Sequence, residues 1–210
     1  MYIDIETIPF EGIENTELYQ TLVDKISAPS NYKDPEIIQK YIDNQKLNLH
    51  RTFQLSPSTS QVACITILSD DKMKTYSLND RSEYSIVSFA FDTLLTEFSE
   101  DIIGFNTRHF DFPFLLFRSL MIGINIADKI KRYKNVLYDH IDIYHEFREF
   151  KHMSQDYIYQ LATGNKIRIP FINYYDFEGT RKEYIEYLIE HNREDVAALA
   201  TIYPIINRPF

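Results

Sequence analysis

Two acidic residues alternate with aliphatic residues at the start of the chain. Asp4 and Glu6 flank Ile5 at the end of residues 2–5, which predict a short strand. Side chains two residues apart share one face of a strand, and like charges placed side by side repel unless a cation compensates them. The pair therefore indicates a metal site, unless both side chains simply face water on an edge strand.

Asp111 lies at the junction between a later predicted strand and a helix. It follows the apolar residues 102–105 and precedes residues 112–121, whose composition predicts a helix. An aspartate at a helix start commonly caps free backbone N–H groups. The same junction is also a place where a ligand can meet the first strand, so both interpretations stand.

A further acid lies inside the last predicted helix, residues 180–206, which we expect to be broken near Glu190. At 3.6 residues per turn, His191 and Asp195 share the face turned toward the protein, whereas Glu194 belongs to the solvated side. A buried acid needs a partner, which can be a hydroxyl, a base or a metal ion. A lone helical histidine is by itself more typical of a hydrogen-bonded core residue.

The elements that must position these residues follow from apolar periodicity and turn residues. We predict strands over residues 2–5, 61–68, 74–78 and 101–105, and helices over residues 17–26, 34–48, 84–98, 112–121, 154–162 and 180–206. Asp34 and Ser154 are expected helix caps, as are Asp139 and Asp142 within the irregular residues 124–150. This order predicts an α/β fold with a central mixed sheet flanked by helices.

Composition agrees with an ordinary globular protein. The chain has 210 residues, of which 44% are hydrophobic and 25% charged, enough for one domain with a core. The single cysteine, Cys64, lies in an apolar run and is expected in the core of a protein from a reducing compartment. The sequence shows neither a signal peptide nor a membrane-spanning stretch, so we expect a cytoplasmic protein without a membrane partner.

The net charge of −9 argues against a general nucleic-acid coat protein, because phosphate binding favours a basic surface. It does not exclude an enzyme that binds nucleic acid through metal ions and a local basic patch. The densest basic run contains Lys131 and Arg132, which could follow a backbone or belong to a solvated loop.

Taken in order, these acids resemble the motifs of the DEDD (DnaQ-like) 3′–5′ exonuclease superfamily, which has the ribonuclease H-like fold. The first motif is similar to residues 2–7 (YIDIET), the second to residues 103–115 (IGFNTRHFDFPFL) and the third to residues 191–199 (HNREDVAAL). Residues 31–35 and 55–57 are similar to insertions in phage and bacterial members related to the exonuclease domain of B-family DNA polymerases. The resemblance implies a single exonuclease domain over residues 1–210, with an insertion at about residues 14–58.

The resemblance also implies the chemistry. Asp4, Glu6, Asp111 and Asp195 would hold two Mg²⁺ or Mn²⁺ ions, and His191 would act as the general base in phosphodiester hydrolysis. The substrate would be the 3′ end of single-stranded nucleic acid, DNA in preference to RNA, and the product a nucleoside 5′-monophosphate. Substrate contacts would come from Asn106, Phe105, Phe110, Lys131 and Arg132, although most phenylalanines are expected in the core. A polymerase or replication protein would be a partner in trans.

One departure from the family pattern leaves other functions open. One branch has Tyr four residues before the last Asp and another has His five residues before it, whereas His191 lies four residues before Asp195. This spacing leaves the branch open and is compatible with a catalytically weakened nucleic-acid-binding subunit. An endonuclease of the same fold is the other alternative.

Overall fold

The computed structural model describes residues 1–96, 101–126, 140–147 and 153–207. The described chain forms two compact units. The first comprises residues 1–6, 62–171 and 179–210, and the second comprises residues 7–61 and 172–178. The acids expected to bind metal, Asp4, Glu6, Asp111 and Asp195, all belong to the first unit, as does His191.

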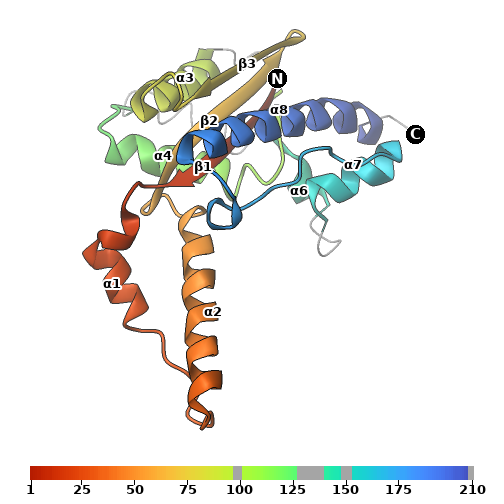
Figure 1. Ribbon diagram of the computed structural model, residues 1–210. Helices are drawn as coiled ribbons and strands as arrows, with labels where there is room; N and C mark the ends of the chain where they lie inside the picture. The colour runs from red at the N-terminus through yellow and green to blue at the C-terminus, as the bar shows by residue number, and fades with distance from the viewer. Residues whose placement is uncertain (97–100, 127–139, 148–152, 208–210) are drawn as a thin grey trace. The chain divides into compact units, whose positions relative to one another are not determined.

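Within the described residues, a five-stranded mixed sheet has the strand order β3-β2-β1-β4-β5, and Figure 1 labels β1, β2 and β3. Its strands are β1 (Tyr2–Pro9), β2 (Ser60–Ser69), β3 (Lys72–Ser77), β4 (Ile103–Gly104) and β5 (Ile141–Asp142). β2 and β3 are antiparallel, whereas β4 runs parallel to both β1 and β5. The prediction of an α/β fold with a mixed sheet is confirmed.

The β2–β3 hairpin turns at Asp70 and Asp71, which both have positive φ, 48° and 59°. Two consecutive residues with positive φ fit a two-residue hairpin turn, and Asp tolerates this conformation better than most residues. Ser69 then pairs with Lys72 on the other strand. The strands predicted over residues 61–68 and 74–78 are confirmed as β2 and β3, the two strands of this hairpin.

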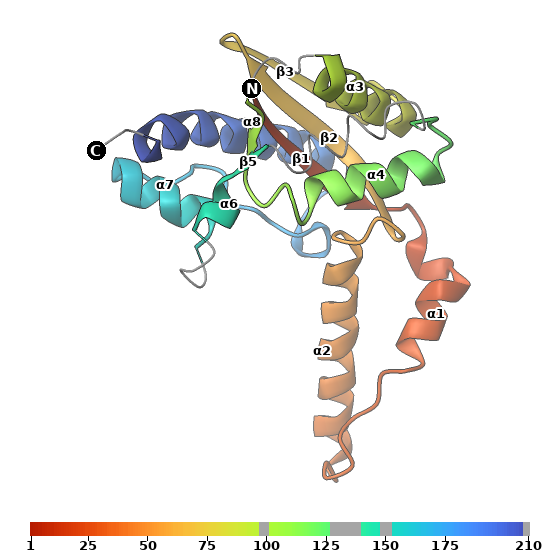
Figure 2. The same cartoon turned by 180° about the vertical axis from the view of Figure 1, so that it is seen from behind.

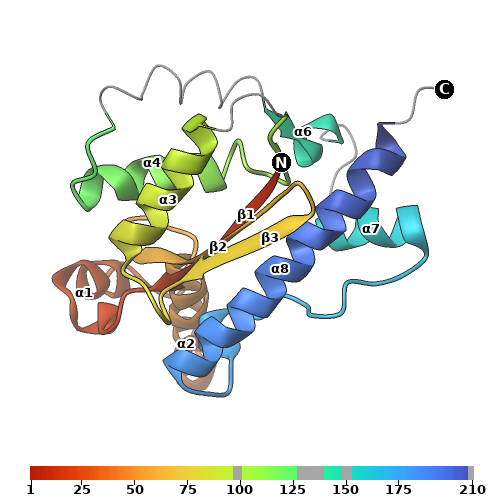
Figure 3. The ribbon, with the colours of Figure 1, turned by 90° about the horizontal axis from the view of Figure 1, so that it is seen from above.

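Helices cover both faces of the sheet. α3 (Glu83–Thr96) and α4 (Asp111–Met121) pack against one face, and α8 (Arg181–Ile206) crosses the other (Figures 2 and 3). Ile3 and Ile5 of β1 belong to the core that α3 and α4 cover. Because side chains alternate along a strand, Asp4 and Glu6 face α8 instead. α6 (Ile143–Glu146) and α7 (Gln155–Thr163) complete the unit, and α7 packs along α8.

The predicted helix starts are confirmed by their hydrogen bonds. Asp34 caps α2 (Pro35–Phe53) by accepting from the Glu36 N–H, and Ser154 caps α7 by accepting from the Tyr157 N–H. Asp142 caps α6. Thr180 forms a capping box with Glu183 at the start of α8. Asp139 lies outside the described residues.

The second unit contains α1 (Glu17–Val23), α2 and the short 3-10 helices η1 (Ile13–Asn15) and η2 (Tyr174–Asp176). Arg51 of α2 forms a bidentate ion pair with Asp176 of η2. His50 of α2 stacks between Tyr19 of α1 and Tyr175 of η2. These contacts hold residues 172–178 to a segment that precedes them by more than a hundred residues.

Two sequence predictions were wrong. α8 continues unbroken through Glu190, because apolar residues line its buried face on both sides of that position. The described part of residues 124–150 is not wholly irregular, because it contains β5 and α6. A two-residue strand and a four-residue helix are too short to show a hydrophobic period. Within the described residues, no helix combines the length and the apolar character needed to cross a bilayer.

Candidate metal centre

β1 directs its acids toward α8. Asn192 Nδ2 of α8 donates a hydrogen bond of 2.5 Å to Asp4 Oδ2, and His191 Nε2 lies 3.4 Å from Glu6 Oε1. Both contacts join residues more than 180 positions apart in the chain. The alternative that the Asp4–Glu6 pair faces only water is therefore wrong.

α8 contributes a further carboxylate, that of Asp195, next to Glu6 and His191. His191 Nε2 lies 3.5 Å from Asp195 Oδ2, one helical turn away. Glu6, His191 and Asp195 each offer a ligand atom, and these atoms all lie within 4.8 Å of one another. Glu6 and His191 are buried, while the Asp195 side chain keeps 17% of its surface exposed. A small opening to solvent therefore remains at Asp195.

Asp111, from α4 (Asp111–Met121), contacts the backbone of β1. It is the first residue of α4, where Phe110 occupies the N-cap position, so Asp111 is not the helix cap that its position allowed. Its Oδ1 instead accepts a 3.0 Å hydrogen bond from the backbone N–H of Ile5, the residue between Asp4 and Glu6. This bond fixes the Asp111 carboxylate next to the acidic pair.

Burial and neighbouring carboxylates raise the pKa values of Asp4 and Glu6. Burial is the main cause of the raised pKa of Asp4, and the charges of Asp111, Glu6 and Asp195 add to it. Burial likewise raises the pKa of Glu6 well above its usual range, with Asp195 and Asp111 contributing. Because the charges of the other three acids all raise the pKa of Asp4, the four predicted acids form one electrostatic cluster.

Burial also raises the pKa of Asp111 to about 7, although the hydrogen bond from Ile5 opposes the shift. The pKa of Asp195 rises to about 6, again chiefly through burial, while nearby His191 lowers it. Buried carboxylates that repel one another fit a cation, which would compensate their charge. Carboxylate oxygens are the ligands that Mg²⁺ and Mn²⁺ prefer, so the donor set fits the predicted ions.

The orientation of His191 is set from its other ring nitrogen. Nδ1 lies 2.8 Å from the carbonyl oxygen of Ile169, and a carbonyl can only accept, so Nδ1 carries a proton. In the neutral ring, Nε2 then has its lone pair directed toward Glu6 and Asp195. The ring also stacks on Tyr187 and contacts Phe171. His191 is thus oriented from several sides rather than being an isolated core histidine.

Sequence reasoning missed Asn192. Its side chain is fully buried, Nδ2 donates to Asp4, and Oδ1 has no hydrogen-bond partner among the described residues. A polar residue on the buried face of α8, next to His191, was the available signal. The backbone of Ile169 was also missed, and nothing in its apolar type could have indicated this contact.

The predicted substrate-contacting residues lie in different surroundings. Asn106 has a positive φ of 58°, and its carbonyl accepts from His109 and Phe110, as expected of a turn residue. Phe105 packs edge-on against Tyr144, and Phe110 packs against Phe114 of α4. Lys131 and Arg132 lie outside the described residues.

Comparison with known proteins agrees with this geometry. The model of the RNase_H superfamily matches residues 52–207, about three quarters of the chain, and the chain belongs to this superfamily. The matched range contains Asp111, His191 and Asp195, while Asp4 and Glu6 precede it. Members of this superfamily are typically nucleases that use divalent metal ions. A search of curated proteins gave no match.

Among solved structures, the chain is similar to the family B DNA polymerase of the hyperthermophilic archaeon Pyrobaculum calidifontis. The TM-score is 0.54 and the sequence identity 15%, over 95% of this chain. The similarity covers only 23% of the polymerase chain. At this identity the likeness establishes the fold alone.

Proposed function

We propose that this protein is a metal-dependent 3′–5′ exonuclease that removes nucleoside 5′-monophosphates from single-stranded DNA. The observation that carries the proposal is the convergence of Asp4, Glu6, Asp111 and Asp195 from β1, α4 and α8, with His191 beside Glu6 and Asp195. The order of these residues along the chain resembles that of the exonuclease motifs, which supports a 3′ end as the substrate.

Each residue has a distinct role in the proposed site. Asp4, Glu6 and Asp195 would hold one metal ion, and Asp4 and Asp111 would hold the other. Bound divalent ions would supply activation of water and compensation of charge on the leaving oxygen. The Ile5 N–H and the Asn192 amide orient Asp111 and Asp4, so the carboxylates are already positioned before any ion binds.

His191 is proposed to accept the proton of the attacking water through Nε2. The Nδ1–H bond to the Ile169 carbonyl keeps this nitrogen aimed into the acidic cluster. A histidine at the tyrosine spacing is compatible with this role because i and i+4 residues share one helix face.

Release of mononucleotides from 3′-labelled single-stranded DNA tests the proposal. We expect release that requires Mg²⁺ or Mn²⁺ and that is lost in Asp4→Ala. Circular single-stranded DNA should remain intact, because an exonuclease needs a free end. Cleavage of the circle would instead support the endonuclease alternative. Binding without hydrolysis under either metal would support the binding-subunit alternative.

A further inference from the structure

The chain from Asn165 to Phe171 runs beside the metal centre without forming a helix or strand. Two hydrogen bonds attach its middle to α8. The Ile169 N–H donates to Glu194 Oε2 at 2.6 Å, and the Ile169 carbonyl lies 2.8 Å from His191 Nδ1. Although it lacks regular structure, this segment is therefore fixed against the helix that carries Asp195.

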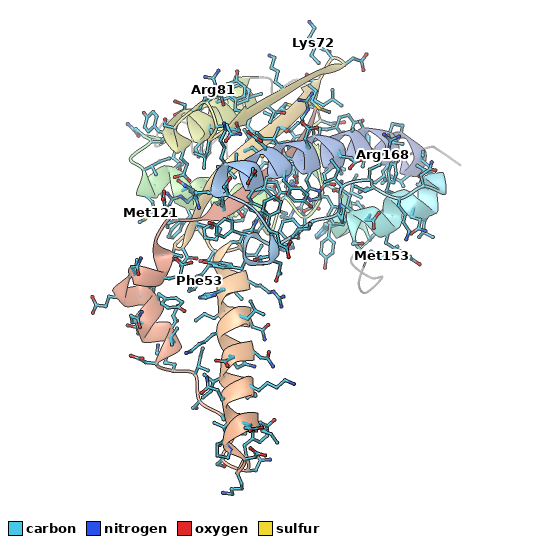
Figure 4. All side chains as sticks on the ribbon, viewed as in Figure 1. Phe53, Lys72, Arg81, Met121, Met153 and Arg168 are labelled. Atoms are coloured by element: carbon cyan, nitrogen blue, oxygen red, sulfur yellow. The ribbon has the colours of Figure 1, made fainter. Side chains whose placement is uncertain are left out.

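A polar hollow of about 420 Å³ lies between this segment and the following turns of α8. Its lining includes Asn165, Lys166 and Arg168 from the segment, opposite Ala197 and Thr201 of the helix, together with one acid of the helix, Glu194. Small side chains on α8 leave the space open. Lys166 and Arg168 are exposed, and within the described residues neither forms a salt bridge. Figure 4 shows Arg168 alongside α8.

An exposed aromatic ring lies at the opposite end of the same segment. Phe171 keeps 47% of its surface exposed, and its ring centre is 5.7 Å from that of His191. The Phe171 ring therefore lies next to His191, the proposed proton acceptor. An exposed ring next to such a site offers a face on which a nucleobase can stack.

We propose that residues 165–171 bind the substrate strand, with Phe171 stacking on the terminal base and Lys166 and Arg168 contacting phosphates further along the strand. This inference rests on the proposed function and specifies how that site takes its substrate. This placement fits a strand whose 3′ end lies in the proposed active site. The stacking ring lies beside His191, and the cations lie along later turns of α8. It also explains how a chain of net charge −9 attracts a polyanion locally.

The phosphate contacts are tested by the double variant Lys166→Ala/Arg168→Ala. Its matched control is Lys72→Ala/Lys74→Ala, which removes the same charge from a hollow of about 150 Å³ that also contains one acid, Asp70. Figure 4 shows Lys72 at the far end of the β2–β3 hairpin. The measurement is the dissociation constant, by fluorescence anisotropy, of a labelled phosphorothioate oligothymidylate at several salt concentrations.

We expect the Lys166/Arg168 variant to bind up to about 25-fold more weakly near 0.1 M salt, and to lower the slope of log K against log salt by about 1.4, because each phosphate contact on a single strand contributes about 0.7. Lys166→Arg/Arg168→Lys should keep most of the affinity. Equal affinities and slopes for the Lys166/Arg168 and Lys72/Lys74 variants would overturn the phosphate contacts.

The stacking contact is tested with Phe171→Ala, which should weaken binding by roughly 10-fold, whereas Phe171→Tyr should retain it. Phe117→Ala removes another exposed ring, on α4, and should leave binding as in the wild-type protein. If Phe171→Ala binds like the wild-type protein, Phe171 is not a stacking residue.

Hydrolysis of thymidine 5′-(4-nitrophenyl phosphate) by the wild-type protein and by Asp4→Ala measures the metal centre separately. This substrate has no second nucleotide to reach Lys166 or Arg168. A wild-type protein that fails to hydrolyse it in Mn²⁺ would count against the proposed function. The anisotropy measurements would still decide whether residues 165–171 bind the strand.

Discussion

At the scale of single residues, the site is defined by acids that are unfavourable without a cation. Asp195 illustrates this best, since burial raises its pKa from 3.8 to about 6. An acid whose pKa is raised on folding binds its proton more tightly in the folded state. Its contribution to stability therefore falls as pH rises from its ordinary value through about 6, and the cost is fully present above that.

Asp195→Asn should abolish metal-dependent hydrolysis and yet stabilise the metal-free protein at pH 8. The pKa shift from 3.8 to about 6 corresponds to at most about 3 kcal/mol, and the lost His191 contact reduces the gain. Thermal unfolding in a chelator should give a higher Tm for the variant at pH 8, with the difference vanishing near pH 4. Glu190→Gln, which changes an exposed acid on the same helix, should show neither effect. A variant that keeps full activity would remove Asp195 from the site.

Asn192 acts through Asp4 and is a positioning residue. Asn192→Ala removes the 2.5 Å hydrogen bond to Asp4 and should weaken Mn²⁺ activation about 10-fold to 100-fold, as loss of a hydrogen bond to a metal ligand commonly does. The measurement is the Mn²⁺ concentration that gives half-maximal hydrolysis. Asn192→Asp should be more harmful, because it adds a negative charge to the cluster. An unchanged Mn²⁺ requirement in Asn192→Ala would contradict the positioning role.

At the scale of elements, the site depends on how α3 and α4 are held to each other and to the sheet. Glu83 at the start of α3 and Arg118 of α4 form a buried ion pair at 2.7 Å, and Glu83 also accepts from the Val62 N–H of β2. This pair connects α3, α4 and β2. Since α4 begins at Asp111, the Glu83–Arg118 contact secures the helix that supplies one of the proposed metal ligands.

Arg118→Ala should lower the free energy of unfolding by about 3–5 kcal/mol, because it leaves the Glu83 carboxylate buried without its cation. Denaturant unfolding measures this loss. The double variant Glu83→Gln/Arg118→Met, which removes both charges, should recover part of it. If the single and double variants are equally destabilised, the unpaired charge is not the cause.

At the scale of the whole molecule, divalent ions should couple the site to the stability of the fold. A ligand that binds only the folded state at 100 times its dissociation constant adds about 2.7 kcal/mol of stability. We therefore expect Mn²⁺ to raise Tm at pH 8. The rise should shrink toward pH 5, because the raised pKa values of Asp111, about 7, and Asp195, about 6, leave these carboxylates protonated. Asp4→Ala should show a much smaller rise at pH 8, and an equal rise would place the binding elsewhere.

Local sequence patterns predict the order of the main elements, several helix caps and the candidate acids. Hydrophobic period and capping residues act over a few positions, so they can be read from the chain, as at Asp34 and Ser154. The short β5 and the continuity of α8 through Glu190 were not determined, because a two-residue strand has no period and buried residues on both sides decide whether a helix continues.

The contacts between residues distant in the sequence follow from the packing of the folded chain. The Asn192–Asp4 and His191–Ile169 contacts join positions far apart in sequence, and a backbone carbonyl such as that of Ile169 leaves no trace in residue type. The same holds for the exposed Phe171 beside His191. Local patterns determine which face a side chain occupies, but the packing of α8 across β1 determines its neighbours, because those contacts form only when the chain closes over long separations.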